Sequence, residues 1–348
     1  MIHYSLKNIN ESNVFKDLCY FQNNIQKSNF ATYQNNLIPV YNSKDIDLKN
    51  IDLKNTDLQS IDLQKDIYEQ FYNNTGAIII KNVYSKYIMD SYNKWSEKQL
   101  LSSMNDPNCR HHKQKDKYLI NDVIGHMSEN NPNLLLELLN NQYFHFFIDV
   151  LLGFSRIGSC TGHWIEPGGN RQMSHVDYPM HAGSKGFWNK DFEKIKKLTT
   201  HHQLNQMLPY FSVQVLIASD KMNKSNGSTE LVPTSHKIQN LDLHIHNKQI
   251  YNEFENKFIN VELEQGDMLI FNRRLCHRGG KNISDKRRNS LIIQCVWLWG
   301  IGQEIIESSK VFKNLEKSSI YENMSEQDKD SFKLRLQAPY PIDVKKSA

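Results

Sequence analysis

The sequence predicts a mainly β domain with flanking helices, an α+β protein whose strands form an antiparallel barrel or jelly roll. Helix-type periodicity comes first, at residues 85–104 and 130–152, and short apolar runs of strand type follow from Ile157 onward. Turn signals such as Pro-Gly-Gly-Asn at residues 167–170 separate those runs. With 348 residues, 39% of them hydrophobic, the chain is long enough to bury its own core.

Residues 1–65 are expected to be a polar N-terminal extension. Within it a short triplet, Ile-Asp-Leu or Thr-Asp-Leu, recurs every five residues, at 46–48, 51–53, 56–58 and 61–63. The pattern resembles a pentapeptide repeat, but stacked units need neighbours to bury their faces, so a spacer is favoured over a solenoid. The folded domain is expected to span residues 66–348.

The elements of that domain follow from local pattern. A helix is predicted at 66–72, and a strand at 77–80 begins the domain proper. The hairpin turn at 167–170 is expected to join two paired strands, 160–165 and 171–178. Further strands are predicted at 211–218, 258–263, 268–271 and 291–299. A helical insertion is expected at about 183–209 and a helical tail at about 305–340.

Charge and composition exclude several classes of partner. The 42 basic and 38 acidic side chains leave a net charge of +4 with no basic block, which is too little for a nucleic-acid-binding surface. No run approaches the roughly 18 apolar residues of a membrane span. The five cysteines form no C-x-x-C pair, so neither a disulfide framework nor a zinc site is indicated. A cytoplasmic monomer or homodimer without nucleic-acid or membrane partners is expected.

His175 and Asp177 are the first candidate site residues. On a strand, positions i and i+2 point to the same side, so the imidazole and the carboxylate would project together. Taken alone, such a pair more often belongs to the solvent-exposed face of a surface strand.

The second half of the chain contains a candidate third metal ligand and a candidate cosubstrate-binding cation. His277, as a third ligand, would complete two histidines and one carboxylate on one face of an octahedral metal, which is the arrangement of non-haem Fe(II) oxygenases. The three open positions would hold a chelating 2-oxo acid and O₂. The distant carboxylate of that acid needs a cation, and Arg288 offers a planar fork, with Ser290 pointing the same way along the strand.

Several sequence blocks then occur in a recognisable order. They are His163-Trp164-x-x-Pro167-Gly168, Gln172-x-x-His175-x-Asp177, Asn226-Gly227-Ser228-Thr229-Glu230, Pro233-x-Ser235-His236, Gly266-Asp267 and Leu275-x-His277-Arg278-Gly279 followed by Asn282 and Arg288. Over residues 67–300 the chain resembles the phytanoyl-CoA dioxygenase (PhyH) family of Fe(II)/2-oxoglutarate oxygenases. The resemblance implies a double-stranded β-helix of cupin-like type, with His175, Asp177 and His277 as iron ligands and Arg288 on 2-oxoglutarate.

The sequence departs from the family pattern at two places, and it keeps the carboxylate that distinguishes hydroxylases from halogenases. Thr234 replaces the glycine of the usual Pro-Gly-Ser-His, and the insertion after Gly186 is long. Related halogenases resemble this pattern but carry a small residue at the carboxylate position. Asp177 therefore favours hydroxylation.

Further residues are candidates for the cosubstrate or the substrate. Gln172 is a candidate cosubstrate contact because it recurs in the family pattern, although strict alternation turns its side chain away from that of His175. His163 is expected to face the site and is the second candidate cosubstrate contact of this kind. Trp164, Tyr178 and His181 are the candidate substrate contacts. Arg287 has the opposite strand parity to Arg288 and is expected to be a surface charge.

The expected function is an Fe(II)/2-oxoglutarate-dependent dioxygenase that uses O₂ and releases succinate and CO₂. The sequence at residues 226–230 and 277–279 resembles that of small-molecule biosynthetic hydroxylases, so the substrate is expected to be a small soluble metabolite or natural-product intermediate. The alternatives are a catalytically silent cupin-like binding protein, and a desaturase or epimerase of the same family.

Overall fold

The computed structural model describes residues 38–46, 48, 58–103, 112–114, 117–177, 212–238, 252, 254–297 and 308–336. Most of the pentad repeat and all of the predicted insertion at 183–209 lie outside these residues.

The strands form two sheets. The large sheet has eight strands in the order β1 (Val40–Asn42), β2 (Ala77–Lys81), β9 (Met268–Asn272), β6 (Ser212–Ile217), β11 (Arg288–Trp297), β5 (Ser155–Ile165), β4 (Lys117–Ile120) and β3 (His112–Gln114). Only the β1–β2 pair is parallel among these. The small sheet contains β10 (His277–Gly279), β7 (Thr229–Leu231) and β8 (Ile259–Asn260). Within the described residues these two sheets form an open jelly roll.

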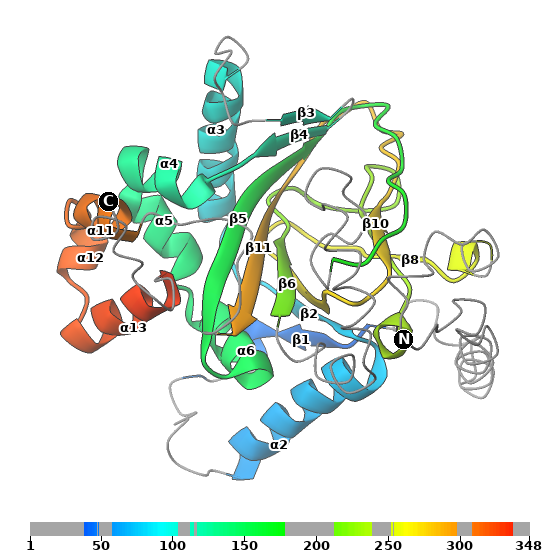
Figure 1. Ribbon diagram of the computed structural model, residues 1–348, viewed down its shortest axis with the longest axis horizontal. Helices are drawn as coiled ribbons and strands as arrows, with labels where there is room; N and C mark the ends of the chain where they lie inside the picture. The colour runs from blue at the N-terminus through cyan, green and yellow to red at the C-terminus, as the bar shows by residue number, and fades with distance from the viewer. Residues whose placement is uncertain are drawn as a thin grey trace, which may run out of the picture.

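Helices cover one face of the large sheet, and the small sheet lies across the other, as Figure 1 shows for α3 to α5 and β10. The helices are α2 (Leu58–Tyr68), which continues into the π-helix η4 (Glu69–Asn74), then α3 (Lys86–Ser103), α4 (Val123–Asn130), α5 (Pro132–Leu139), α6 (Gln142–Leu152), α11 (Ser308–Leu315), α12 (Ser319–Glu322) and α13 (Glu326–Leu336). The described residues also include two short 3-10 turns, η3 (Ser43–Asp45) and η6 (Ser235–Lys237).

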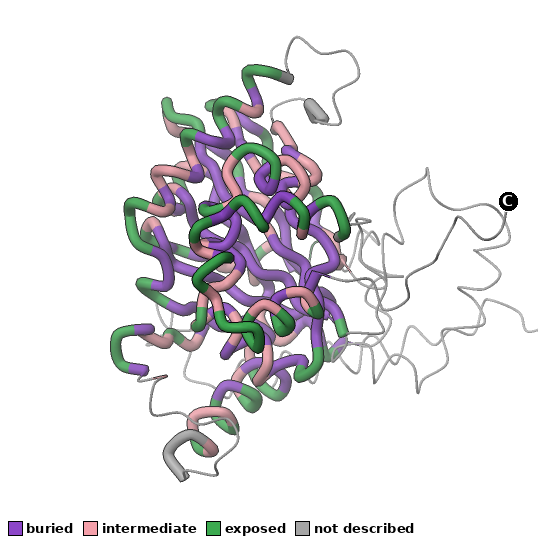
Figure 2. The backbone as a smooth tube through the Cα atoms, turned by 90° about the vertical axis from the view of Figure 1, so that its left-hand side faces the viewer, coloured by how far each residue is buried: buried purple, intermediate pink, exposed green. Residues whose placement is uncertain are grey.

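Alternation along β11 divides the interior into two apolar clusters. Leu291 and Ile293 pack with the helices, whereas Ile292 packs against the cluster between the two sheets. Buried positions accordingly run through the centre of the molecule, with exposed ones on the outer turns (Figure 2). Since side chains two apart share a face, Arg288 and Ser290 lie on the inter-sheet face with Ile292.

Several predicted elements are confirmed. The helix expected at 85–104 is α3, and the strands expected at 211–218, 268–271 and 291–299 correspond to β6, β9 and β11. The helix expected at 130–152 is two helices, because the Asn141 side chain accepts hydrogen bonds from the main-chain N–H groups of Tyr143 and Phe144 and begins α6 anew. β1 lies in the region expected to be an extension and pairs with β2.

The hairpin expected between 160–165 and 171–178 is wrong. Residues 167–170 do turn, with Gly168 at φ 76°, but β5 pairs with β4 and β11. Residues 171–177 make only an isolated bridge, His175 to His277. The main-chain N–H groups of this segment donate to carbonyls around β10, so its partner is a strand far away in the sequence.

His236 in η6 gives the fold a pH dependence. Its imidazole is buried, its Nε2 lies 3.0 Å from the Tyr72 carbonyl, and burial lowers its pKa to about 4. Because histidine in an unfolded chain has a pKa of about 6.5, protons bind the unfolded state first, and stability is lost between about pH 6.5 and pH 4.

We predict that His236→Gln, which keeps a donor for Tyr72 but does not titrate, reduces this loss by about 2–3 kcal/mol on going from pH 7 to pH 4.5. Urea denaturation of both proteins at the two pH values measures it. Parallel pH profiles would contradict the assignment.

Candidate metal centre

Three side chains converge where the segment 171–177 meets β10. The Nε2 atom of His175 lies 3.7 Å from one carboxylate oxygen of Asp177, and the Nε2 atom of His277 lies 3.5 Å from the other. One ligand atom from each residue lies within 4.8 Å of the other two, close enough for a single ion to reach all three. No other such group of three His, Cys, Asp or Glu side chains occurs among the residues that the structure describes.

Main-chain bonds hold these side chains in place. His175 and His277 exchange both backbone hydrogen bonds, at 3.0 and 2.9 Å, and the Asp177 N–H donates to the Arg273 carbonyl at 2.8 Å. Each histidine Nδ1 lies 2.9 Å from the carbonyl two residues before it. A carbonyl can only accept, so Nδ1 carries the proton and the Nε2 lone pair faces Asp177.

The electrostatics favour cation binding at this point. Burial, and next the neighbouring His175, lower the pKa of His277 to about 4, so its imidazole is neutral at pH 7. The residues present therefore suit a divalent metal that takes nitrogen and oxygen ligands. Sequence reasoning missed Arg273, a buried residue whose Nε lies 3.9 Å from Asp177; the signal was its position four residues before His277.

Arg288 is a buried cation at the start of β11. Its guanidinium donates to the Ser290 hydroxyl at 3.0 Å and to the Gly227 carbonyl at 3.1 Å. Burial lowers its pKa to about 10, a change that Asp220 opposes. Among the described residues no carboxylate oxygen lies within 4.0 Å of it, and its Nε has no hydrogen-bond partner. A buried guanidinium without a carboxylate partner is suited to bind the carboxylate of a ligand.

Arg287 behaves as its parity predicts. Its Nε pairs with Glu166 at 2.7 Å, its guanidinium lies 5.0 Å from the centre of the Trp164 ring, and the side chain is 38% exposed. The two neighbouring arginines therefore differ sharply in environment.

The register separates the remaining candidates. His163 stands opposite Ser290 and shares the inter-sheet face with it. Trp164 stands opposite Asn289 and belongs to the helix-side cluster, so its placement does not favour the substrate contact expected of it. The Gln172 side-chain oxygen accepts from the Gly279 N–H at 2.8 Å, which binds it to β10. Tyr178 and His181 lie outside the described residues.

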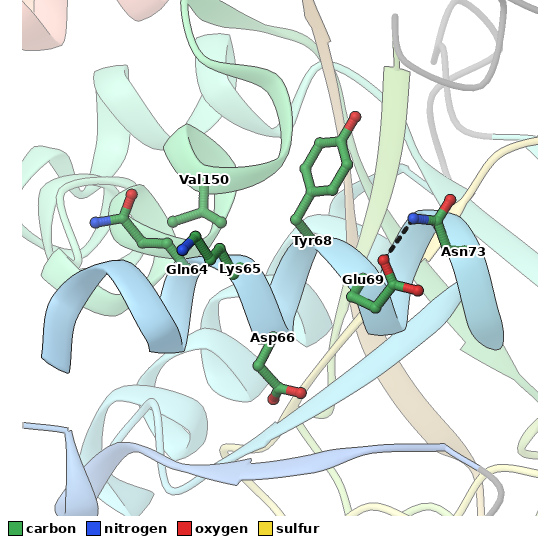
Figure 3. Close-up of a pocket in the computed structure, with 7 residues that line it drawn as sticks. All are labelled: Gln64, Lys65, Asp66, Tyr68, Glu69, Asn73 and Val150. Carbon is green, nitrogen blue, oxygen red and sulfur yellow. Dashed lines mark hydrogen bonds between the residues drawn. The ribbon is translucent and has the colours of Figure 1, made fainter. Parts of the chain in front are cut away.

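A groove along α2 is a separate feature. Its lining residues come from α2, η4 and α6, and none belongs to the metal-centre residues: Gln64, Lys65, Asp66, Tyr68, Glu69, Asn73 and Val150 (Figure 3). These are mostly charged and amide side chains of one helical surface. They contain no histidine, cysteine or nucleophilic pair that would suggest a second reaction centre.

A jelly roll that gathers two histidines and a carboxylate beside a buried arginine defines the class of non-haem iron oxygenases. The family model described as Phytanoyl-CoA dioxygenase (PhyH) matches residues 72–290. The chain belongs to this family, and it is an Fe(II)/2-oxoglutarate-dependent dioxygenase. The family and cofactors expected from the sequence are thereby confirmed.

Individual relatives agree with this membership. The chain is 26% identical over 239 residues to a dioxygenase called olcK from Penicillium canescens, covering 66% of this chain and 68% of that protein. It is 22% identical to a dioxygenase called aneA from Aspergillus aculeatus, covering 69% and 77%. The structure of HygX from Streptomyces hygroscopicus with nickel and 2-oxoglutarate superposes with a TM-score of 0.50 at 11% identity, covering 68% of this chain and 89% of that one, which shows the fold.

Across the described residues, no helix has the length and apolar character needed to cross a bilayer.

Proposed function

We propose that this protein hydroxylates a small soluble metabolite or natural-product intermediate, with Fe(II) held by His175, Asp177 and His277. One observation carries the proposal: the three candidate ligands gather within reach of a single ion, in a fold that also buries Arg288 on the inter-sheet face of β11. The Phe271 ring lies 4.9 Å from the His277 ring and belongs to the inter-sheet cluster that also contacts Ile292 of β11.

The sheet register supports distinct positions for metal and cosubstrate. Ile292, Leu216 and Leu269 form one cross-strand row. This row lies between Ser290 on one side and Phe271, beside His277, on the other. An apolar row flanked by a metal centre and a buried arginine suits 2-oxoglutarate, which has two methylene groups between its keto-acid end and its distal carboxylate.

The protein's own residues would prepare this reaction in separate ways. Fe(II) and 2-oxoglutarate, when bound, supply the activation of O₂ and the oxidation of a C–H bond. The Met173 and Leu275 carbonyls orient the two imidazoles. Arg288 and Ser290 bind the distal carboxylate, and His163, opposite Ser290, lies near enough on the same face to assist. The apolar row keeps water away.

Asp177 supports oxygenation over halogenation. On an octahedral metal, two histidines, one carboxylate and a chelating 2-oxo acid would fill five positions, so one would remain for O₂ and none for chloride. The reaction is therefore proposed to insert oxygen into the substrate. Desaturation, epimerisation and a silent binding protein are the other outcomes that product analysis distinguishes.

We predict that His277→Ala loses most Fe(II) binding and all 2-oxoglutarate consumption, because one of only three ligands is gone. Anaerobic isothermal titration of the apo-protein with Fe(II) measures the first effect, and a succinate assay measures the second. The wild type should also show a weak visible charge-transfer band with Fe(II) and 2-oxoglutarate. Unchanged iron affinity in the variant would contradict the ligand assignment.

We predict that Arg288→Ala weakens 2-oxoglutarate binding by about 2–4 kcal/mol, because it removes the buried charge-assisted pair. Arg287→Ala is the matched control, since its side chain pairs with Glu166 on the surface, and it should change binding little. Anaerobic titration of the charge-transfer band gives both dissociation constants. Equal effects would show that the distal carboxylate binds elsewhere.

We predict that the wild-type product carries one oxygen atom from ¹⁸O₂ and no chlorine, with or without chloride in the buffer. Asp177→Gly opens a metal position but offers chloride no prepared surroundings, so activity should collapse instead of changing to chlorination. Mass spectrometry of the products decides between these outcomes. A chlorinated wild-type product would overturn the coordination count.

A further inference from the structure

We propose that four charged side chains on the outer face of the small sheet act as positioning residues for the metal centre. They form what we call the clamp: Arg171, Glu230, Glu255 and Arg278. Its proposed task is to hold the segment that carries His175 and Asp177 against the strand that carries His277. The inference rests on the proposed function, because it assigns these residues to the geometry of that metal site.

The need for such a device follows from the way the ligand segment is bound. Residues 171–177 form no strand, and their ladder contact with β10 is the isolated His175–His277 bridge. Gln172 adds two bonds to Gly279: its main-chain N–H donates to the Gly279 carbonyl at 2.9 Å, and its side-chain oxygen accepts from the Gly279 N–H at 2.8 Å. Two histidine ligands from remote parts of the chain therefore meet across a very short contact.

Glu230 lies at the centre of the clamp, and it receives one arginine from each ligand segment. Its Oε2 accepts from the Arg278 Nε at 2.5 Å, and its Oε1 accepts from Arg171 at 3.2 Å. Glu230 is only 3% exposed, and it stands opposite Arg278 in the β7–β10 register. Arg278 directly follows His277, and Arg171 lies on the short segment that leads to His175.

Glu255 closes the clamp from the other side. It accepts two hydrogen bonds from Arg278, at 2.7 and 3.1 Å, and lies 3.6 Å from Arg171. The Arg278 guanidinium also stacks over the Phe258 ring, 3.8 Å from its centre. The clamp therefore pairs two arginines with two glutamates. The planar Arg278 guanidinium, which donates to both glutamates, gives the clamp a defined geometry.

The energetics favour a positioning role over a stabilising one. The buried Arg278 guanidinium donates to both Glu230 and Glu255, so its charge is paired on two sides. Buried ion pairs contribute little net stability because desolvation offsets the attraction between the charges. Groups that orient metal ligands without touching the metal, by contrast, commonly change metal affinity by about 10- to 100-fold.

Arg171→Met is the sharpest test. Arg171 is 44% exposed, and removing it leaves the buried Arg278–Glu230–Glu255 interactions in place, so no buried charge loses its last partner. We expect the Fe(II) dissociation constant to rise about tenfold, with the melting temperature of the metal-free protein nearly unchanged. The charge-transfer band with 2-oxoglutarate should shift or weaken in parallel. Anaerobic Fe(II) titration and thermal unfolding of the metal-free protein give both quantities.

Lys221→Met is the matched control. Lys221 also pairs with a glutamate, Glu264, at 2.6 Å, but both side chains are exposed, and neither residue belongs to β10 or to the segment 171–177. The control should bind Fe(II) like the wild type. Arg171→Lys keeps the charge but not the fork, so its Fe(II) affinity should fall between those of the wild type and Arg171→Met.

The outcomes separate the clamp from the proposed function. Failure of the wild type to bind Fe(II) would refute the metal site itself. Tight Fe(II) binding by the wild type with the same affinity in Arg171→Met would refute the clamp alone. If Arg171→Met does not fold, Arg171→Lys is decisive, because wild-type affinity in that variant would equally overturn the inference.

Discussion

The pair of backbone hydrogen bonds between His175 and His277 is the contact on which the rest of the site depends. It joins an irregular segment that follows β5 to the first residue of β10, and it places two imidazoles with ring centres 4.3 Å apart. A further backbone hydrogen bond, from the Asp177 N–H to the Arg273 carbonyl, holds the carboxylate beside the two imidazoles. Without this contact the ligands would remain three separate polar residues on two segments.

Strand parity in β11 connects that site to the body of the fold. Leu291 and Ile293 anchor the strand against the helices, while Arg288, Ser290 and Ile292 face the space between the sheets. Asn289 shows the same division, since its side chain donates to Asn93 and Ser96 of α3. One strand thus supplies both a core face and a binding face, so a register shift would exchange them.

Charges are distributed in this structure according to their tasks. Arg288 is buried and donates its hydrogen bonds to neutral groups, the Ser290 hydroxyl and the Gly227 carbonyl, which leaves its charge available for an anionic ligand. Arg278, ten residues earlier on β10, is buried against two carboxylates and is held in one orientation. The same residue type can therefore bind a cosubstrate or brace a strand, depending on which partners the fold brings near it.

Local pattern determined much of this protein from the sequence alone. The three candidate ligands follow from the resemblance of the sequence blocks to the family. The parity of Arg288 and Ser290 and the course of α3 follow from residue type and spacing, because alternation and helical period are properties of short stretches. Tertiary structure decided the pairing. Residues 171–177 bond to β10 and not to β5, Gln172 is held by Gly279, and Trp164 faces the helices. Those outcomes depend on which distant strand offers free N–H and carbonyl groups, and the sequence near each residue does not contain that information.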